Sequence, residues 1–413
     1  LSISLLAVLG YYFCTKVLKI PAWLTFLGEF TAVSFCWCPT GSFYNYVTYI
    51  FFLISVICLY LGLSRGKGGL LFAAGVALGC NVLARFSNLP EAAMIVGVWA
   101  HGIICWLEEQ KSIVQDCVDV AGNAGTEDKK ARKKAAGRRL RKKLLQDTGM
   151  CLAGYLTALL VLFGYIQIRY GMDEYVRGIQ RLFSMTEVAT DYTAASMILG
   201  MFDWYLQNLY WELRMCVFLI VGMIAVGFLE FAATSVRDSY AGKDTIKKAL
   251  RILEWVVSAV LAVIMVFWLY RQGFCAREYT NYGAIIWPGV TFLTLTLLVT
   301  LWRIFMPSAP GEEKLLSGLI FLIVLITSLG SNNKLYPSMN NLFLALPYMY
   351  WQFYRFCKYA GSFRWKRMTI SPIPAKCLFG GFFLLFFIQV GLFGRSFVFA
   401  EGTGVQELSA QVT

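Results

Sequence analysis

Runs of apolar residues, separated by short polar stretches, recur along the whole chain. Several runs reach the ~20 residues that a helix needs to cross a bilayer, and flanking Trp and Tyr extend the shorter ones. The pattern predicts an all-α fold, a polytopic transmembrane helical bundle of about 12 membrane segments. The segments are 1–15, 23–38, 46–63, 69–84, 92–107, 150–168, 213–232, 252–270, 285–306, 315–329, 342–357 and 376–393.

The polar stretches divide the chain into four parts. Five N-terminal membrane helices occupy 1–107, and a basic cytoplasmic loop occupies 108–149. Membrane helices, together with an outer-face loop at 169–212, occupy 150–393, and a polar outer-face tail occupies 394–413.

Composition supports a membrane protein. Hydrophobic residues make up 58% of the chain and charged residues 15%, whereas soluble domains carry about 25% charged and roughly 45–50% apolar residues. The 12 Trp and 22 Tyr suit anchoring at two membrane interfaces. In the fourth segment, Gly75 and Gly79 lie four residues apart, which predicts a helix face that allows close contact with a second helix.

The 37 Lys and Arg residues provide an independent test of the topology. When the turn after the third segment is placed in the cytoplasm, most of them fall in cytoplasmic loops, as the positive-inside rule requires. Loops 108–149 and 233–251 are then cytoplasmic, and loops 169–212 and 330–341 lie outside.

The loop 108–149 carries two dense basic runs, at 129–134 and 138–143. Such runs bind anionic lipid headgroups, with about 1 kcal/mol for each basic residue near the surface. The alternative is a solvated loop that only fixes the topology. No aromatic residues are interleaved with the basic ones to stack on bases, so we expect no nucleic-acid partner.

The outer loop 169–212 contains candidates for acid–base chemistry. Apolar residues at helical spacing from Val176 to Phe183 predict an amphipathic helix along the outer interface. The adjacent Asp173 and Glu174, and Asp191 further on, are the candidate catalytic carboxylates. Each could serve as a general base or bind a divalent cation. The alternative is that they are solvated loop carboxylates.

Two further outer stretches carry candidate substrate-binding residues. In 84–91, Arg85 could clamp a phosphate bidentately, with Asn88 beside it. Arg85 could equally extend to the interface or pair with Glu91. In 330–341, many neutral donors and acceptors surround a lysine, which suits a hydroxyl-rich ligand or a phosphate, although Gly, Asn and Pro are also ordinary turn formers. The candidates there are Asn332, Asn333, Lys334 and Asn340.

Other chemistries are disfavoured. His101 is the only histidine and lies in an apolar segment, so a zinc site, a histidine triad or a bis-histidine haem is not expected. No Walker motif is present. No metal or cofactor is therefore predicted, although the outer carboxylates leave a divalent cation open. Glu29 lies inside an apolar segment, where a carboxylate is costly and marks a functional position by default.

The stretch from 44 to 91 resembles the GT-C-type polytopic glycosyltransferases, a group that includes the mannosyltransferase and aminoarabinose-transferase families. The resemblance comprises an aromatic–polar cluster at 44–49, a short basic turn at 64–68, a small-residue helix at 71–79 and the Ala-Arg-Phe at 84–86. These enzymes use lipid-linked sugar donors and carry an essential acidic motif in their first outer loop. The chain shows no counterpart of that motif, so no catalytic residue is carried over. We expect that the spans bearing it precede Leu1.

The resemblance implies a glycosyltransferase in a bacterial inner (plasma) membrane. It would transfer a sugar from a polyprenyl-phosphate-linked donor on the outer face, with inversion. Its partners would be membrane lipids and the lipid-linked sugar donor. A transporter or flippase for a lipid-linked or polar solute, with Glu29 and Arg85 lining its path, is the alternative.

Overall fold

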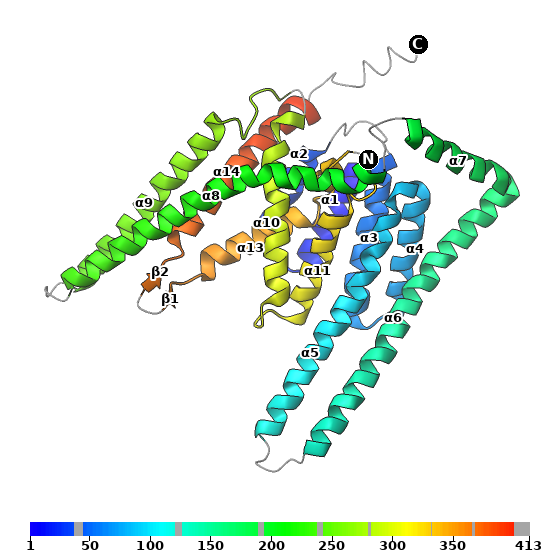
Figure 1. Ribbon diagram of the computed structural model, residues 1–413, viewed down its shortest axis with the longest axis horizontal. Helices are drawn as coiled ribbons and strands as arrows, with labels where there is room; N and C mark the ends of the chain where they lie inside the picture. The colour runs from blue at the N-terminus through cyan, green and yellow to red at the C-terminus, as the bar shows by residue number, and fades with distance from the viewer. Residues whose placement is uncertain are drawn as a thin grey trace. The chain divides into compact units, whose positions relative to one another are not determined.

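The computed structural model describes residues 1–36, 44–119, 126–188, 194–237, 243–279, 282–331, 333–365 and 368–399. Nearly all of these residues are helical (Figure 1). Each predicted apolar segment contains a helix, which confirms the all-α prediction. The exception is a small hairpin, in which β1 (Phe363–Trp365) pairs antiparallel with β2 (Met368–Ile370) and Phe363 lies opposite Ile370.

Seven helices in the described part of the chain are long and apolar enough to cross a membrane, so the protein is a polytopic membrane protein. They lie at Asn45–Arg65, Asn88–Ile113, Lys130–Arg169, Ile198–Ala232, Lys248–Arg271, Ile286–Phe305 and Ile373–Val398. The count of about 12 is not confirmed. Several other apolar helices are shorter than these seven: the apolar stretches Ser2–Val17, Ala22–Phe35 and Gly68–Ala84, and also α11 and α13, which have 16 and 15 residues.

The chain forms two compact units whose segments alternate along the sequence. The first unit comprises 1–13, 42–202 and 295–345, and the second comprises 14–41, 203–294 and 346–413. Three α-helices contribute residues to both units, namely α8 (Ala194–Arg237), α10 (Ile286–Phe305) and α13 (Ala345–Tyr359).

Besides parts of these helices, the first unit contains α1 (Ser2–Tyr12), α3 (Tyr44–Arg65), α4 (Gly68–Ala84), the 3-10 helix η2 (Phe86–Ile95), α5 (Val96–Asp119), α6 (Thr126–Arg169), α7 (Met172–Val188), α11 (Gly311–Ile326) and α12 (Tyr336–Asn340). Helix α4 packs against α3 and α6. A Cβ at Gly75 would collide with the Cys151 carbonyl oxygen, and one at Gly79 with the Ala158 side chain. The predicted close contact is thus confirmed.

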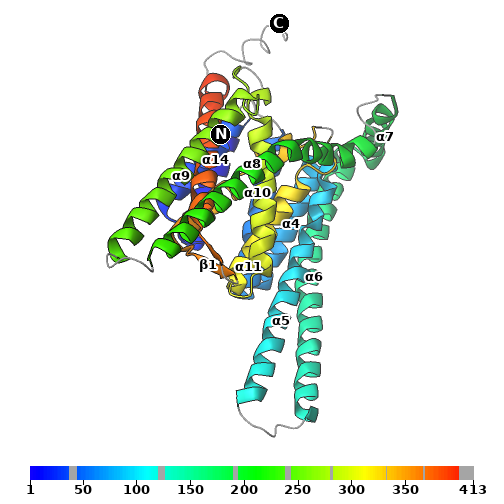
Figure 2. The ribbon, with the colours of Figure 1, turned by 60° about the vertical axis from the view of Figure 1, so that its left-hand side comes forward.

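The described residues of 108–149 belong to two helices rather than to a loop. Helix α5 continues to Asp119, and α6 begins at Thr126 and runs for 44 residues, or about 66 Å at 1.5 Å per residue. Figures 1 and 2 show α5 and α6 side by side, extending past α3 and α4. The reason is composition, because Lys, Arg, Ala and Leu are strong helix formers even where they are charged. Similarly, the predicted outer loop 169–212 contains α7 and the start of α8.

The second unit contains the π-helix η1 (Phe13–Val17) from Cys14 onward, α2 (Ala22–Phe35), α9 (Lys243–Arg271), η4 (Tyr282–Ala284), the hairpin, α14 (Ile373–Phe393) and the π-helix η5 (Gly394–Val398). Helix α14 packs against α9 and α2. The buried Gln389 ties it to the segment before α10 by donating to the Ala276 and Ala284 carbonyls, at 2.8 and 3.0 Å. Phe292 and Phe386 stack with ring centroids 5.0 Å apart.

Candidate functional site

A group of polar side chains lies at the C-terminal end of α4, in the first unit. Glu91 is 1% exposed, and Asn81 donates a hydrogen bond to its carboxylate. Asn88 donates to the Asn81 side-chain oxygen at 3.0 Å, and Arg85 donates to the Asn45 side-chain oxygen at 3.0 Å. These five residues are called the α4–η2 cluster below.

The local sequence explains why these groups meet. Helix α4 ends at Ala84, and Arg85 adopts an extended conformation that turns the chain. The following ten residues form the 3-10 helix η2, which contains Pro90. A proline has no N–H to donate and disfavours a regular α-helix, so the segment folds back along the end of α4. This return brings Asn88 and Glu91 beside Asn81.

Arg85 and Glu91 have different hydrogen-bond partners in the cluster, while the positive charge of Arg85 also acts on the Glu91 carboxylate. The hydrogen bond that the Glu91 carboxylate accepts comes from Asn81, and the half-buried Arg85 bonds to Asn45. A guanidinium has five N–H donors in a planar fork that matches phosphate or carboxylate oxygens. A carboxylate, three amides and a guanidinium thus gather at the end of an apolar helix.

The second predicted stretch, 330–341, forms a turn and the short helix α12. Asn340 donates to the Tyr336 carbonyl at 2.9 Å, and the Asn333 backbone N–H donates to Ser331 Oγ at 3.2 Å. Lys334 has a φ of 51°, the left-handed conformation typical of turns. Asn332 lies outside the described residues. These local bonds are those of a turn, which is the simpler of the two interpretations that the sequence left open.

The two stretches lie at the same end of the first unit, because α5 and α11 run antiparallel. Lys314 at the start of α11 reaches Glu108 at 2.8 Å. About two turns further along α11, Leu322 lies next to Gly97. A Cβ built at Gly97 would be 3.6 Å from Leu322 Cδ1. The C-terminal end of α11 is therefore beside η2, which it contacts. Just beyond it, Ser328 and Ser338 are hydrogen-bonded at 2.7 Å.

The candidate catalytic carboxylates are not part of this cluster. Asp173 and Glu174 lie in the exposed first turn of α7, where Glu174 forms an ion pair with Arg177 at 2.8 Å. No hydrogen bond or ion pair joins them to the α4–η2 cluster in the part of the chain that the structure describes. Asp191 lies outside that part. In the same part, no three His, Cys, Asp or Glu side chains gather as a metal site.

Glu29 occupies the interior of the second unit. Its side chain is 5% exposed, and neither carboxylate oxygen has a hydrogen-bond partner among the described residues. The neighbouring turn of α2 carries Thr31, which contacts the Tyr350 hydroxyl at 3.2 Å. The sequence had marked Glu29 as unusual, and its burial agrees with that.

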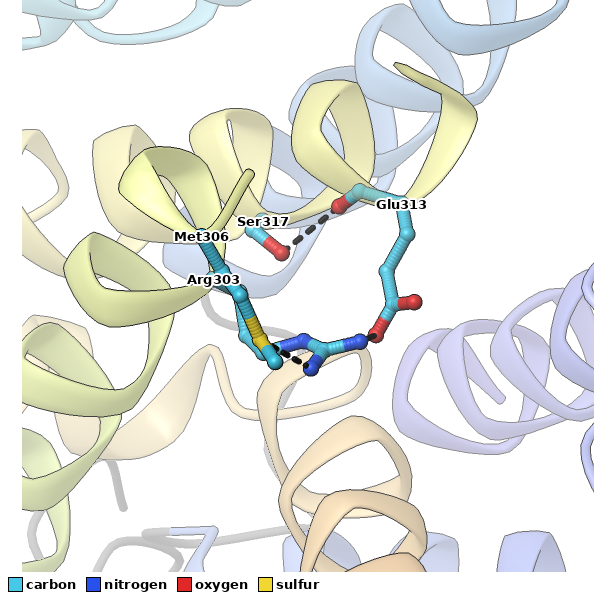
Figure 3. Close-up of polar contacts among 4 residues, drawn as sticks. All are labelled: Arg303, Met306, Glu313 and Ser317. Atoms are coloured by element: carbon cyan, nitrogen blue, oxygen red, sulfur yellow. Dashed lines mark hydrogen bonds and ion pairs between the residues drawn. The ribbon is translucent and has the colours of Figure 1, made fainter. Parts of the chain in front are cut away.

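A charged cluster lies at the other end of α11, away from η2. Arg303 on α10 and Glu313 on α11 form an ion pair and are each 8% exposed (Figure 3). Arg303 also donates to Met306 Sδ at 3.1 Å, and Ser317 Oγ donates to the Glu313 carbonyl at 2.6 Å. In the sequence, Arg303 lies near the end of the predicted segment 285–306 and Lys314 just before the segment 315–329. Their burial depends on how α10, α11 and α5 meet.

Asn81 was missed in the sequence. Its signal was a lone amide within the apolar segment 69–84, where a polar side chain needs a partner. Comparisons of the chain with models of protein families, with curated proteins and with solved structures find no match. The evidence for function is therefore the arrangement of the side chains described above.

Proposed function

We propose that this chain is a membrane glycosyltransferase that transfers a sugar from a polyprenyl-phosphate-linked donor. The observation that carries the proposal is the α4–η2 cluster. It combines a buried carboxylate, three amides and a guanidinium at the end of apolar helices, which is the chemistry that a phosphate-linked sugar requires. The resemblance of residues 44–91 to GT-C-type enzymes covers the same residues.

In the proposed reaction, Arg85 binds the donor phosphate, and Asn88 bonds to sugar hydroxyls. An acceptor hydroxyl attacks the anomeric carbon from the face opposite the phosphate. The bond between that carbon and the phosphate oxygen breaks, and polyprenyl phosphate leaves with the electron pair. Glu91 takes the proton of the acceptor hydroxyl as general base. The configuration at the anomeric carbon is inverted, and no metal is required.

We further infer that the cluster faces the outside of a bacterial inner membrane. The distribution of Lys and Arg supports this orientation, with 108–149 and 233–251 in the cytoplasm. The shorter apolar helices α1, α2, α4, α11 and α13 complete about twelve membrane segments, since a helix shorter than the bilayer is accommodated at modest cost.

The test is sugar transfer from a panel of radiolabelled polyprenyl-phosphate sugars by membranes that contain the protein. Glu91→Gln keeps the acceptor oxygen for Asn81 but removes the base, so transfer is expected to fall by about 100-fold, at the low end of the effect of losing a general base. Arg85→Ala is expected to reduce transfer by weakening donor binding. Immunoblotting confirms equal protein levels.

Glu109→Gln is the matched control, because Glu109 is an exposed carboxylate whose ion pair with Arg139 lies on the α5–α6 hairpin. It is expected to retain full activity. If Asp173→Asn or Glu174→Gln abolishes transfer while Glu91→Gln remains active, the general base lies on α7 and is not Glu91. Absence of transfer from every donor contradicts the enzyme proposal.

The second candidate is a transporter or flippase, which the burial of Glu29 favours. A carboxylate without a partner inside apolar helices is stable when protonated, and proton carriers use such groups. Under this proposal, Glu29→Gln reduces solute uptake driven by a pH gradient in vesicles to background, while Glu174→Gln retains it. Uptake that is unchanged in Glu29→Gln contradicts a role for this residue.

A further inference from the structure

An apolar cavity of about 220 Å³ lies in the first unit between α5, α10 and α11. Its wall is formed by aliphatic and aromatic side chains, together with Gly97 and Gly318. Representative lining residues are Val96, Ala100, Leu301, Phe305, Leu315 and Leu322. A cavity with such a wall offers water few hydrogen-bond partners, so an apolar occupant is favoured over water.

The polar lining of this cavity is at one end. His101 and Lys314 are the polar side chains of its wall. Lys314 is paired with Glu108 at 2.8 Å, next to the buried pair of Arg303 and Glu313. Lys143 of α6 acts electrostatically on His101, and it belongs to the basic run 138–143, which holds five cations. Lys314 and Arg303 are each paired with a carboxylate, so the excess positive charge near this end of the otherwise apolar cavity comes from the run 138–143 on α6.

The surrounding helices place the cavity at membrane depth. Candidate spans cover both Asn88–Ile113 and Ile286–Phe305. Large apolar side chains beside the cavity point outward, since Trp99 and Trp302 are 47% and 58% exposed. In a bilayer these side chains contact lipid. The charged residues Glu108 and Lys314 then mark the level of the headgroups.

We propose that this cavity binds an acyl chain of an anionic glycerophospholipid, with the lipid phosphate held near Lys143. The acyl chain matches the apolar wall, and the negative headgroup matches the basic end. No residue that lines the cavity belongs to the α4–η2 cluster, although the cavity extends along α11 to Val96 and Leu322, next to η2. The lipid-binding proposal can therefore be tested independently of the proposed transferase activity.

Gly318 allows a direct test. A Cβ at Gly318 would meet no atom within 4 Å, and Gly318 lines the cavity, so a leucine there is expected to occupy part of the cavity. Gly164 on α6 has the same free space and does not line the cavity, which makes Gly164→Leu the matched control. The purified protein is incubated with equal phosphatidylglycerol and phosphatidylcholine, and bound lipid is counted by native mass spectrometry.

The wild type and Gly164→Leu are expected to retain phosphatidylglycerol in preference to phosphatidylcholine, and Gly318→Leu is expected to lose it. Lys143→Gln is expected to reduce the preference for phosphatidylglycerol about fivefold, the effect of one cation near a lipid surface. If the wild type retains both lipids equally, the site does not select an anionic headgroup, and that part of the proposal is wrong. Equal phosphatidylglycerol retention by Gly318→Leu and Gly164→Leu overturns the cavity as the site.

Discussion

Glu313→Ala is expected to lower the free energy of unfolding by about 3–5 kcal/mol, the usual cost of removing one partner from a buried ion pair. The loss leaves the Arg303 guanidinium buried and without its carboxylate. Its Nε already lacks a hydrogen-bond partner among the described residues, so little else compensates the charge (Figure 3). The measurement is a titration of the purified protein with denaturing detergent, followed by circular dichroism.

Glu174→Ala is the matched control, because the pair of Glu174 and Arg177 is 64% and 59% exposed. Exposed pairs contribute about 0–1 kcal/mol, so this variant is expected to unfold almost like the wild type. The double variant Arg303→Met, Glu313→Met removes both charges and is expected to recover most of the loss. If Glu313→Ala lowers the free energy of unfolding by no more than Glu174→Ala does, the ion pair of Arg303 and Glu313 is not buried.

Gly75→Leu is expected to destabilise the packing of α4 against α6 by at least about 3 kcal/mol, the upper end of typical overpacking costs. The obstacle at this position is backbone, namely the Cys151 carbonyl and the Tyr155 amide nitrogen, which cannot rotate away as a side chain can. The same detergent titration measures the effect.

Gly164→Leu provides the comparison for Gly75→Leu, since it adds the same side chain to α6 at a position where a Cβ has no neighbour within 4 Å. Because leucine is a better helix former than glycine, this variant is expected to keep or raise the free energy of unfolding, by up to about 1 kcal/mol. If both variants unfold alike, α4 and α6 do not pack as closely as described.

The sequence predicted the helices well because hydropathy is a local property. A run such as 376–393 has no stable state in a bilayer other than a helix, whose backbone groups are bonded within the segment. It falls within α14 (Ile373–Phe393). The spacing of Gly75 and Gly79 likewise predicted a close helix contact, since both glycines lie on one face. The partner helix, α6, could not be predicted from spacing alone.

The site was predicted in part. Arg85, Asn88 and Glu91 attract attention as polar groups at the end of an apolar segment, and the structure brings Asn88 and Glu91 together around Asn81. The role of Asn81 depends on the return of η2 along α4, which the sequence does not specify. The sequence does not show which carboxylates become buried. The exposed Asp173 and Glu174 were therefore candidates on the same footing as the buried Glu91.

By itself, the sequence determined that this is an all-helical membrane protein, because each apolar run must satisfy its own backbone in a bilayer. It also identified the basic region, although as a loop rather than the hairpin of α5 and α6. Only the tertiary structure decided which polar groups meet. Asn81 with Glu91, and Arg303 with Glu313, lie ten residues apart in the chain and meet only after it reverses direction. Such reversals depend on packing between helices, which hydropathy does not encode.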